Sequence, residues 1–300
     1  MKTPWWFLKK NPVAMLMLPV AWVYFFLSQI VALVRGLRPM KSRRKIVCVG
    51  NILAGGVGKT PIVRAIANYF GAPVVMRGYK KSDKTGNVGD EAIMLARTGL
   101  AVHVGDRKSN IALLNRQDDN TPIVMDDGLQ NPTIKKDVSI VVFDESLGYG
   151  NGWLLPAGPL RVPKRFAKKA DAIIVIKSGR KRKNFKLPDG VPVFWAKNQT
   201  VSPYADDVKL VAFAGIGYPR KFFNALKNVV ATRSFPDHYQ FTSEDLEKLM
   251  NLAKKKKAQL ITTEKDWVRL PVELQDQIKY ARLDTVLDNN FWDWLKEKIK

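Results

Sequence analysis

The fold is decided by the stretch Gly50-Asn51-Ile52-Leu53-Ala54-Gly55-Gly56-Val57-Gly58-Lys59-Thr60-Pro61. It follows the apolar run Ile46-Val47-Cys48-Val49 and precedes a helical pattern of apolar residues at 62, 63, 65, 66, 69 and 70. A strand, a glycine-rich turn and a helix that begins at Gly-Lys-Thr form the context of a phosphate-binding loop. Backbone N–H groups of such a turn, together with the positive end of the helix, bind phosphate oxygens. The sequence therefore predicts a nucleoside triphosphate site.

Particular residues of this stretch have predicted roles. In loops of this kind the lysine reaches the β- and γ-phosphates and the next hydroxyl holds Mg²⁺, so Lys59 and Thr60 take these places. Asp126 and Asp127 end the apolar run 123–125, where phosphate-loop enzymes place an acidic residue that helps to hold Mg²⁺. We therefore expect ATP and Mg²⁺ as cofactors, with Thr60, Asp126 and Asp127 as metal ligands. The residues expected to bind the nucleotide are Gly55, Gly56, Val57, Gly58, Lys59, Thr60 and Pro61.

The loop departs from the strict pattern, which leaves other classes of protein open. The strict pattern has a glycine where Leu53 stands. A Gly-Gly-x-Gly-Lys-Thr variant occurs in partition-type ATPases, but those carry a lysine where this chain has Ala54. A glycine turn that binds no phosphate is the remaining alternative, and the order of strand, turn and helix disfavours it.

Composition limits the number of domains and the kinds of partner to be expected. The 300 residues suit about two domains. The net charge of +23 is compatible with nucleic acid, an anionic membrane surface or an anionic substrate. The single cysteine, Cys48, excludes a disulfide framework and is expected to be a small core residue.

The N-terminal segment favours the membrane surface among these partners. Residues 13–34 contain no charged side chain, and this uncharged run is long enough to span a bilayer. Basic residues flank this run, and the heavier group follows it, at Arg35, Arg38, Lys41, Arg43, Arg44 and Lys45. This charge bias places the rest of the chain in the cytoplasm. A helix that lies in the interface, a cleaved signal peptide and a buried core helix are the alternatives.

Strands and helices alternate beyond the loop. Apolar strand patterns at 73–76, 101–104, 123–125, 138–143 and 172–176 alternate with helical patterns at 91–98 and 107–116, which predicts a parallel sheet with flanking helices. From residue 204 a second, smaller α/β domain is expected, after a basic, proline-containing linker at 177–203. The predicted fold is therefore an α/β P-loop NTPase-like sheet, a smaller second α/β domain and an N-terminal membrane-associated helix. The predicted boundaries are 1–45, 46–203 and 204–300.

Several short motifs follow one another in a specific order. After the phosphate loop come Arg77-Gly78-Tyr79, Val88-Gly89-Asp90-Glu91, Asp126-Asp127-Gly128-Leu129-Gln130, Gly150-Asn151-Gly152-Trp153-Leu154-Leu155-Pro156-Ala157-Gly158-Pro159-Leu160-Arg161, Ala214-Gly215-Ile216-Gly217, Phe235-Pro236-Asp237-His238 and Thr263-Glu264-Lys265-Asp266. In these motifs, which run from about residue 49 to 266, the chain resembles the tetraacyldisaccharide 4′-kinases of lipid A biosynthesis. The combination is far more specific than the phosphate loop alone.

The resemblance implies a kinase that moves the γ-phosphoryl group of ATP to the 4′-hydroxyl of a tetraacylated glucosamine disaccharide 1-phosphate, giving lipid IVA. It implies Asp90 as the base on the sugar hydroxyl, His238 as its partner, and Lys59 on the transferring phosphoryl group. It also implies work at the cytoplasmic face of the inner membrane of a Gram-negative bacterium, on an anionic membrane surface. Nucleic acid and an obligate protein partner are not expected.

Two departures from the family pattern concern the metal. Asn131 stands where the family has a histidine, and Val162 where it has a glutamate. If that glutamate helps to hold Mg²⁺, metal binding in this chain rests more heavily on Thr60, Asp126 and Asp127.

The candidate base has a simpler alternative reading. Asp90 is expected in the first domain and His238 in the second, so that domain closure brings them together. Alternatively, Asp90 only caps the helix 91–98 and His238 is a surface loop residue. The other histidine, His103, lies in a strand pattern and is expected to be structural.

Overall fold

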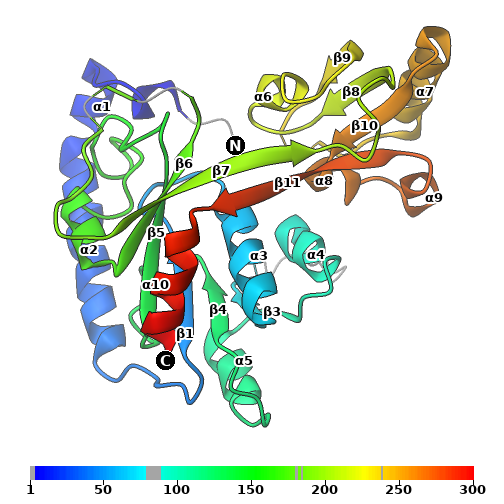
Figure 1. Ribbon diagram of the computed structural model, residues 1–300. Helices are drawn as coiled ribbons and strands as arrows, with labels where there is room; N and C mark the ends of the chain where they lie inside the picture. The colour runs from blue at the N-terminus through cyan, green and yellow to red at the C-terminus, as the bar shows by residue number, and fades with distance from the viewer. Residues whose placement is uncertain (1–3, 79–88, 180–181, 184, 238) are drawn as a thin grey trace. The chain divides into compact units, whose positions relative to one another are not determined.

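The computed structural model describes residues 4–78, 89–179, 182–183, 185–237 and 239–300 (Figure 1). The chain forms two compact units. We call them the large unit, which consists of residues 4–78, Gly99–Lys197 and Thr285–Lys300, and the small unit, which consists of Gly89–Thr98 and Asn198–Asp284. His238 lies outside the described residues.

The large unit is built on a parallel sheet. Its strands, in spatial order, are β3 (Val102–Val104), β2 (Val74–Met76), β4 (Ile123–Asp126), β1 (Ile46–Gly50), β5 (Val138–Asp144), β6 (Ala172–Lys177) and the part of β7 (Val193–Val201) up to Lys197. Strands β1, β4 and β6 are nearly continuous runs of buried apolar residues, as expected when both faces of a sheet are covered. The helices of this unit include α3 (Lys59–Phe70), α5 (Arg107–Leu114), the 3₁₀ helix η2 (Lys164–Lys169) and α10 (Asn289–Ile299). Val49 of β1 lies opposite Asp126 of β4, so the two carboxyl ends meet.

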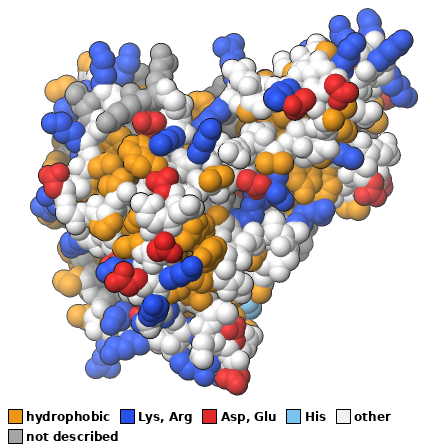
Figure 2. Space-filling model, in the orientation of Figure 1, with side chains coloured by type: hydrophobic (Ala, Val, Ile, Leu, Met, Phe, Trp, Pro, Cys, Tyr) orange, Lys and Arg blue, Asp and Glu red, His pale blue; other side chains and the backbone are white. Residues whose placement is uncertain are grey.

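The strands of the small unit also pair in parallel. In spatial order they are β11 (Lys279–Leu287, of which the residues up to Asp284 belong to this unit), β10 (Gln259–Thr263), β8 (Leu210–Ala214) and β9 (Val229–Ser234). Its helices are α4 (Asp90–Ala96), α6 (Pro219–Phe223), α7 (Ser243–Lys256), α8 (Glu264–Trp267) and α9 (Val272–Gln275). Helix α7 begins at a capping box in which Thr242 and Asp245 exchange hydrogen bonds. Basic side chains gather over its far end, where Lys254, Lys255 and Lys256 form the last turn (Figure 2).

The parallel α/β fold predicted from the sequence is confirmed, while the division of the chain differs from the predicted boundaries. Helix α4, expected in the first domain, belongs to the small unit, where the Arg97 guanidinium lies 4.2 Å from the ring centroid of Trp267. Helix α10, expected in the second domain, belongs to the large unit. Its Phe291 is fully buried, and the ring centroids of Phe291 and Phe194 lie 5.3 Å apart. The expected linker 177–203 contains β7, which pairs with β6.

The N-terminal segment contains the 3₁₀ helix η1 (Trp5–Phe7), α1 (Pro12–Leu16) and α2 (Leu18–Gly36), drawn in blue in Figure 1. Among the described residues, α2 alone is long and apolar enough to cross a membrane, with a mean hydropathy of 1.6 and 11% of the apolar window buried. Ala21 and Phe25 are its buried residues. The remaining apolar side chains of α2 are mostly exposed.

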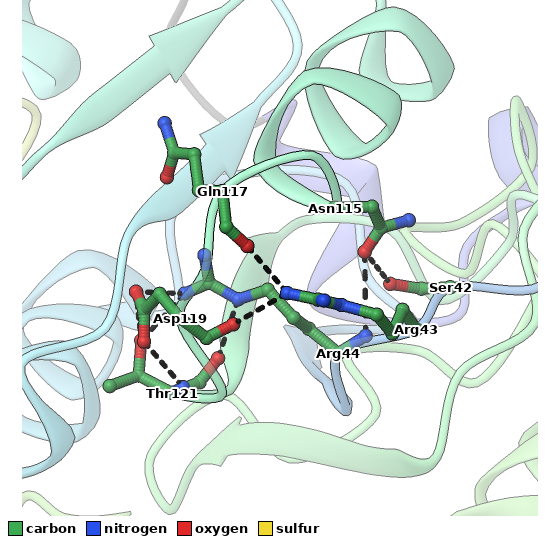
Figure 3. A network of polar contacts seen from close by, with 7 residues as sticks. All are labelled: Ser42, Arg43, Arg44, Asn115, Gln117, Asp119 and Thr121. Atoms are coloured by element: carbon green, nitrogen blue, oxygen red, sulfur yellow. Dashed lines mark hydrogen bonds and ion pairs between the residues drawn. The ribbon is translucent and has the colours of Figure 1, made fainter.

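A polar network fixes the start of β1 (Figure 3). Arg44 is 2% exposed and forms an ion pair of 3.0 Å with Asp119, while its Nε donates to the carbonyl of Thr121 at 2.7 Å. Ser42 and the backbone N–H of Arg44 both donate to Asn115. The segment before β1 is therefore tied to the α5–β4 connection. Arg44, counted from the sequence among the basic residues that follow the membrane helix, is a buried structural residue.

Candidate active site

The phosphate loop connects β1 to α3. Gly55 and Gly58 have φ values of 106° and 82°, which glycine adopts without strain. Two backbone hydrogen bonds brace the loop, from Ala54 N to the carbonyl of Pro159 at 2.7 Å and from Arg161 N to the carbonyl of Ile52 at 2.8 Å. Gly55 and Gly56 are exposed and Val57 is buried, so the glycine face of the turn is open to solvent.

Lys59 begins α3 and lies between two oxygen-bearing side chains. Its Nζ is 3.4 Å from Oδ1 of Asn51 and 3.6 Å from Oδ1 of Asp127. Thr60 and Pro61 follow in the first turn of α3 and are half-buried. The structure therefore brings the predicted cation of the loop beside the predicted acid of β4.

Asp127 is held by a second cation. Nη1 of Arg161 donates to both carboxylate oxygens of Asp127, at 3.1 and 2.9 Å. Burial raises the pKa of Asp127, but the charges of Lys59 and Arg161 outweigh burial and hold the pKa below its usual value. Asp127 is therefore a carboxylate at neutral pH.

Asp126 and Asp127 are also fixed through their backbones. Nη2 of Arg107 donates to the carbonyl of Asp126 at 2.6 Å and to that of Asp127 at 3.2 Å. The Asp126 side chain is 4% exposed at the end of β4, and Asp127 has a φ of 51°, which turns the chain sharply after the strand. Burial lowers the pKa of Arg107.

The turn after Asp127 packs against the strand that leads into the loop. A Cβ on Gly50 would lie 2.6 Å from Cγ of Leu129, so only glycine fits at the end of β1. Gln130 donates from Nε2 to the carbonyl of Asn51 at 2.7 Å. The Asp-Asp-Gly-Leu-Gln motif therefore supports the phosphate loop from the neighbouring strand.

The described residues contain no group of three or more His, Cys, Asp or Glu side chains that could hold a metal ion. This donor set still suits Mg²⁺, which is commonly bound by one or two carboxylates together with water and substrate phosphates. Val162 is a buried apolar residue, and Asn131 accepts hydrogen bonds from the N–H and hydroxyl of Thr133. Val162 therefore has no oxygen to offer a metal ion, and Oδ1 of Asn131 is bonded to Thr133.

Asp90 lies in a separate cluster within the small unit. Arg269 donates to Oδ2 of Asp90 through Nε at 2.9 Å and through Nη2. The side chains of Arg269 and Asp90 are 4% and 25% exposed. Asp90 is the first residue of α4, and no side-chain capping bond is made by Gly89, which holds the N-cap position. Asp90 is thus positioned by an ion pair, and the alternative that it is the N-cap is wrong.

Residues of two further motifs hold Arg269 in place. Nη1 of Arg269 is 3.4 Å from Oδ1 of Asp266, and Oδ2 of Asp266 accepts from Gly215 N at 2.9 Å and from the Thr263 hydroxyl at 2.7 Å. Burial raises the pKa of Asp266 even though these donors and Arg269 favour its charged form. The Gly215 and Thr263–Asp266 motifs therefore form the support of Arg269.

The structure places Lys59 beside Asp127, which directly follows Asp126 at the end of β4, and Thr60 follows Lys59 in α3; the metal and catalytic roles of these residues stay predictions. The sequence reasoning gave no role to Asn51, Arg107, Arg161 or Arg269. Arg161 ends the Pro-Ala-Gly-Pro motif, and this position was a signal available in the sequence. Arg269 lies outside the quoted motifs, three residues after Asp266, and nothing in the sequence connects it to Asp90.

Comparison with known proteins shows the family to which the chain belongs. The tetraacyldisaccharide-1-P 4′-kinase family matches residues 13–300. Tetraacyldisaccharide 4′-kinases from Maricaulis maris and Paramagnetospirillum magneticum are 37% and 38% identical, over 88% and 98% of this chain and 84% and 95% of those proteins. LpxK from Aquifex aeolicus, solved in complex with ATP, has a similar fold, with a TM-score of 0.73, 21% identity, and coverage of 96% of this chain and 100% of that one.

Proposed function

The chain belongs to the tetraacyldisaccharide-1-phosphate 4′-kinase family, and we propose that it transfers the γ-phosphoryl group of ATP to the 4′-hydroxyl of a tetraacylated glucosamine disaccharide 1-phosphate. The product is lipid IVA, an intermediate of lipid A biosynthesis. The observation that carries the proposal is the placement of Lys59 at the phosphate loop, 3.6 Å from Asp127 and 3.4 Å from Asn51. A preset cation at this point stabilises the charge of a transferring phosphoryl group.

We propose that Thr60, Asp126 and Asp127 hold Mg²⁺. The charge of a Mg²⁺ ion held there would offset the negative charge of the ATP phosphates during transfer. Arg161 and Lys59 keep Asp127 ionised, which suits both an ion pair and a metal contact. The backbone N–H groups of residues 55–60 cradle the phosphates of ATP.

We propose that Asp90 takes the proton from the 4′-hydroxyl and that His238 assists it. The Gly-Asp-Glu motif supports this role. The contacts that hold the Asp90 side chain support it too, because a base must be held in one orientation to act efficiently. The Arg269–Asp266 support described above supplies that orientation for Asp90.

We propose that α2 anchors the protein in the inner membrane with its remaining residues at the cytoplasmic face. The exposed apolar surface of α2 supports this anchoring, since water does not solvate such a surface favourably. An acceptor with four acyl chains resides in the same membrane, so the anchor keeps enzyme and acceptor in one phase.

The direct test is phosphoryl transfer from γ-labelled ATP to the lipid disaccharide 1-phosphate in non-ionic detergent micelles with Mg²⁺. We expect a labelled lipid whose new phosphomonoester lies on the 4′-oxygen, as identified by phosphorus–proton correlation NMR. The full-length Lys59→Ala protein is the matched control and should leave the lipid unlabelled. Transfer to another position, or hydrolysis of ATP without a labelled lipid, would contradict the proposal.

A further inference from the structure

A cavity of about 300 Å³ lies in the large unit, lined by residues from four segments of the chain. One wall contains Leu8 and Lys10, which precede α1 and α2. The other walls come from the loop that begins at Tyr149, from Lys164 at the start of η2, and from Arg182, Lys183 and Phe185. Its charged lining residues are Lys10, Lys164, Arg182 and Lys183. We call this feature the basic cavity.

The described lining of the basic cavity carries positive charge only. Among the residues that the structure describes, no carboxylate lines the cavity, and Lys10, Lys164 and Lys183 form no ion pair. Several like charges around one hollow repel one another, and an anion between them relieves this repulsion. The cavity therefore favours an anionic ligand.

The walls of the basic cavity are fixed by the surrounding contacts. Asn151 donates from its backbone N–H to the carbonyl of Phe7 at 2.7 Å and from Nδ2 to that of Trp6 at 2.8 Å, which ties the N-terminal segment to the loop. Arg182 donates to the carbonyl of Leu8. A Cβ on Gly152 would lie 2.8 Å from Nζ of Lys164, so glycine leaves the space that this ammonium group occupies.

The loop of the basic cavity also leads to the nucleotide site. It begins at Tyr149, whose ring centroid lies 5.1 Å from Nζ of Lys164, and it ends at Arg161, which contacts Asp127. Phe185 and Tyr149 give the cavity an apolar side, and their ring centroids lie 5.3 Å apart. A phosphate carried on a sugar or a lipid has the matching combination of charge and apolar surface.

We propose that the basic cavity binds the phosphate group of an anionic lipid. Two lipids offer this chemistry: the acceptor through its 1-phosphate, which rests on the proposed function, and a membrane phospholipid through its headgroup. Lys10 and Lys164 provide ammonium groups for the phosphate oxygens. Bound there, the phosphate holds its lipid beside the membrane helix and at the start of the loop that ends at the nucleotide site.

The test compares two full-length double variants with the wild type. Lys10→Ala/Lys164→Ala removes two cations of the cavity, and Lys9→Ala/Lys168→Ala removes two exposed cations of the same segments that do not line it. Lys10→Arg/Lys164→Arg keeps the charge and should keep binding. All substituted positions are exposed, and equal melting temperatures confirm folding.

The first measurement is binding without ATP of the acylated disaccharide, with and without its 1-phosphate, in non-ionic micelles. Binding is monitored by intrinsic tryptophan fluorescence, to which Trp153 contributes with a ring centroid 5.6 Å from Nζ of Lys10. The second is flotation with phosphatidylcholine vesicles, with and without phosphatidylglycerol. If the acceptor is the ligand, Lys10→Ala/Lys164→Ala weakens binding of the 1-phosphate form on the order of tenfold and leaves the other form unchanged. If a phospholipid is the ligand, the same variant loses the part of vesicle binding that depends on phosphatidylglycerol.

The proposal is overturned if Lys10→Ala/Lys164→Ala behaves as Lys9→Ala/Lys168→Ala does in both measurements. Since neither measurement needs turnover, a wild-type protein that binds the 1-phosphate selectively and transfers no phosphoryl group would contradict the proposed function and leave the basic cavity as a lipid phosphate site.

Discussion

Arg269 and Asp90 are 179 positions apart in the chain and meet through two hydrogen bonds on one oxygen, Oδ2 of Asp90. A guanidinium group that donates twice to one carboxylate oxygen holds that oxygen in place through charge-assisted hydrogen bonds. Asp266 fixes the guanidinium group in turn. The orientation of the proposed base is therefore set from within the small unit.

Removal of Arg269 should impair proton abstraction by Asp90, the proposed base. We expect Arg269→Ala to lower kcat by on the order of tenfold with an unchanged KM for ATP, and Asp90→Asn to lower kcat by roughly a hundredfold or more. Because Arg269 acts through Asp90, adding Arg269→Ala to Asp90→Asn should cost little more. Steady-state kinetics of the four proteins measure this coupling, and effects that multiply would show that Arg269 acts independently of Asp90.

Lys59 should be indispensable for transfer. We expect Lys59→Ala to lower turnover by on the order of a thousandfold, because the transferring phosphoryl group loses its cation. Lys108→Ala on α5 makes the same change of charge at an exposed position and should leave turnover unchanged. Single-turnover transfer of labelled phosphate gives the measurement, and a folded Lys59→Ala protein of near-normal rate would refute the assigned role.

The ion pairs of Asp127 should make stability depend on pH. The folded-state pKa of Asp127 lies below its usual value, so its stabilising contribution is present above the unfolded pKa of about 3.9 and is lost as pH falls below it. Asp127→Asn should therefore melt at a lower temperature than the wild type at pH 7, and this difference in melting temperature should become smaller below about pH 4. Melting followed by circular dichroism from pH 7 to pH 3 provides the test. A difference in melting temperature that stays constant over this pH range would mean that the carboxylate charge contributes nothing to stability.

The exposed face of α2 should hold the protein in the membrane. Phe26 and Ile30, each 59% exposed, lie one turn apart on this helix. Phe26→Glu/Ile30→Glu adds two charges at a cost of about 3 kcal/mol each in a bilayer, which should move the protein to the soluble fraction after a high-salt wash. Leu113→Glu on α5 is the control and should remain in the membrane fraction. This test avoids deletion of residues 1–34, because Trp6 and Phe7 contact Asn151.

Local sequence patterns were sufficient for the parts of the molecule that local physics determines. The strand, glycine turn and helix around Lys59 follow from residues adjacent in the chain, and so does the acid at the end of β4. The assignment of α4 and α10 to their units does not follow in this way. Apolar periodicity shows that one face of a helix is buried, but it does not say against which partner.

The same limit explains the residues that sequence reasoning missed. The pairs Arg269–Asp90 and Arg161–Asp127 join positions 179 and 34 residues apart, and only the folded chain brings them together. In the sequence alone, an arginine between predicted elements is expected to be an exposed surface residue. Its role becomes visible only from the carboxylate that it contacts.

The position of α10 after the small unit in the chain has a consequence for biosynthesis. The ring of Trp292 on this helix stacks on Tyr69 of α3, with centroids 4.2 Å apart, and Phe291 and Leu295 are fully buried. The ribosome releases these residues after every residue of the small unit has been made. The unit that carries the phosphate loop therefore completes its core only after the small unit has been synthesised, and a nascent chain stalled before residue 285 would expose the surface that α10 covers, a target for chaperones and proteases.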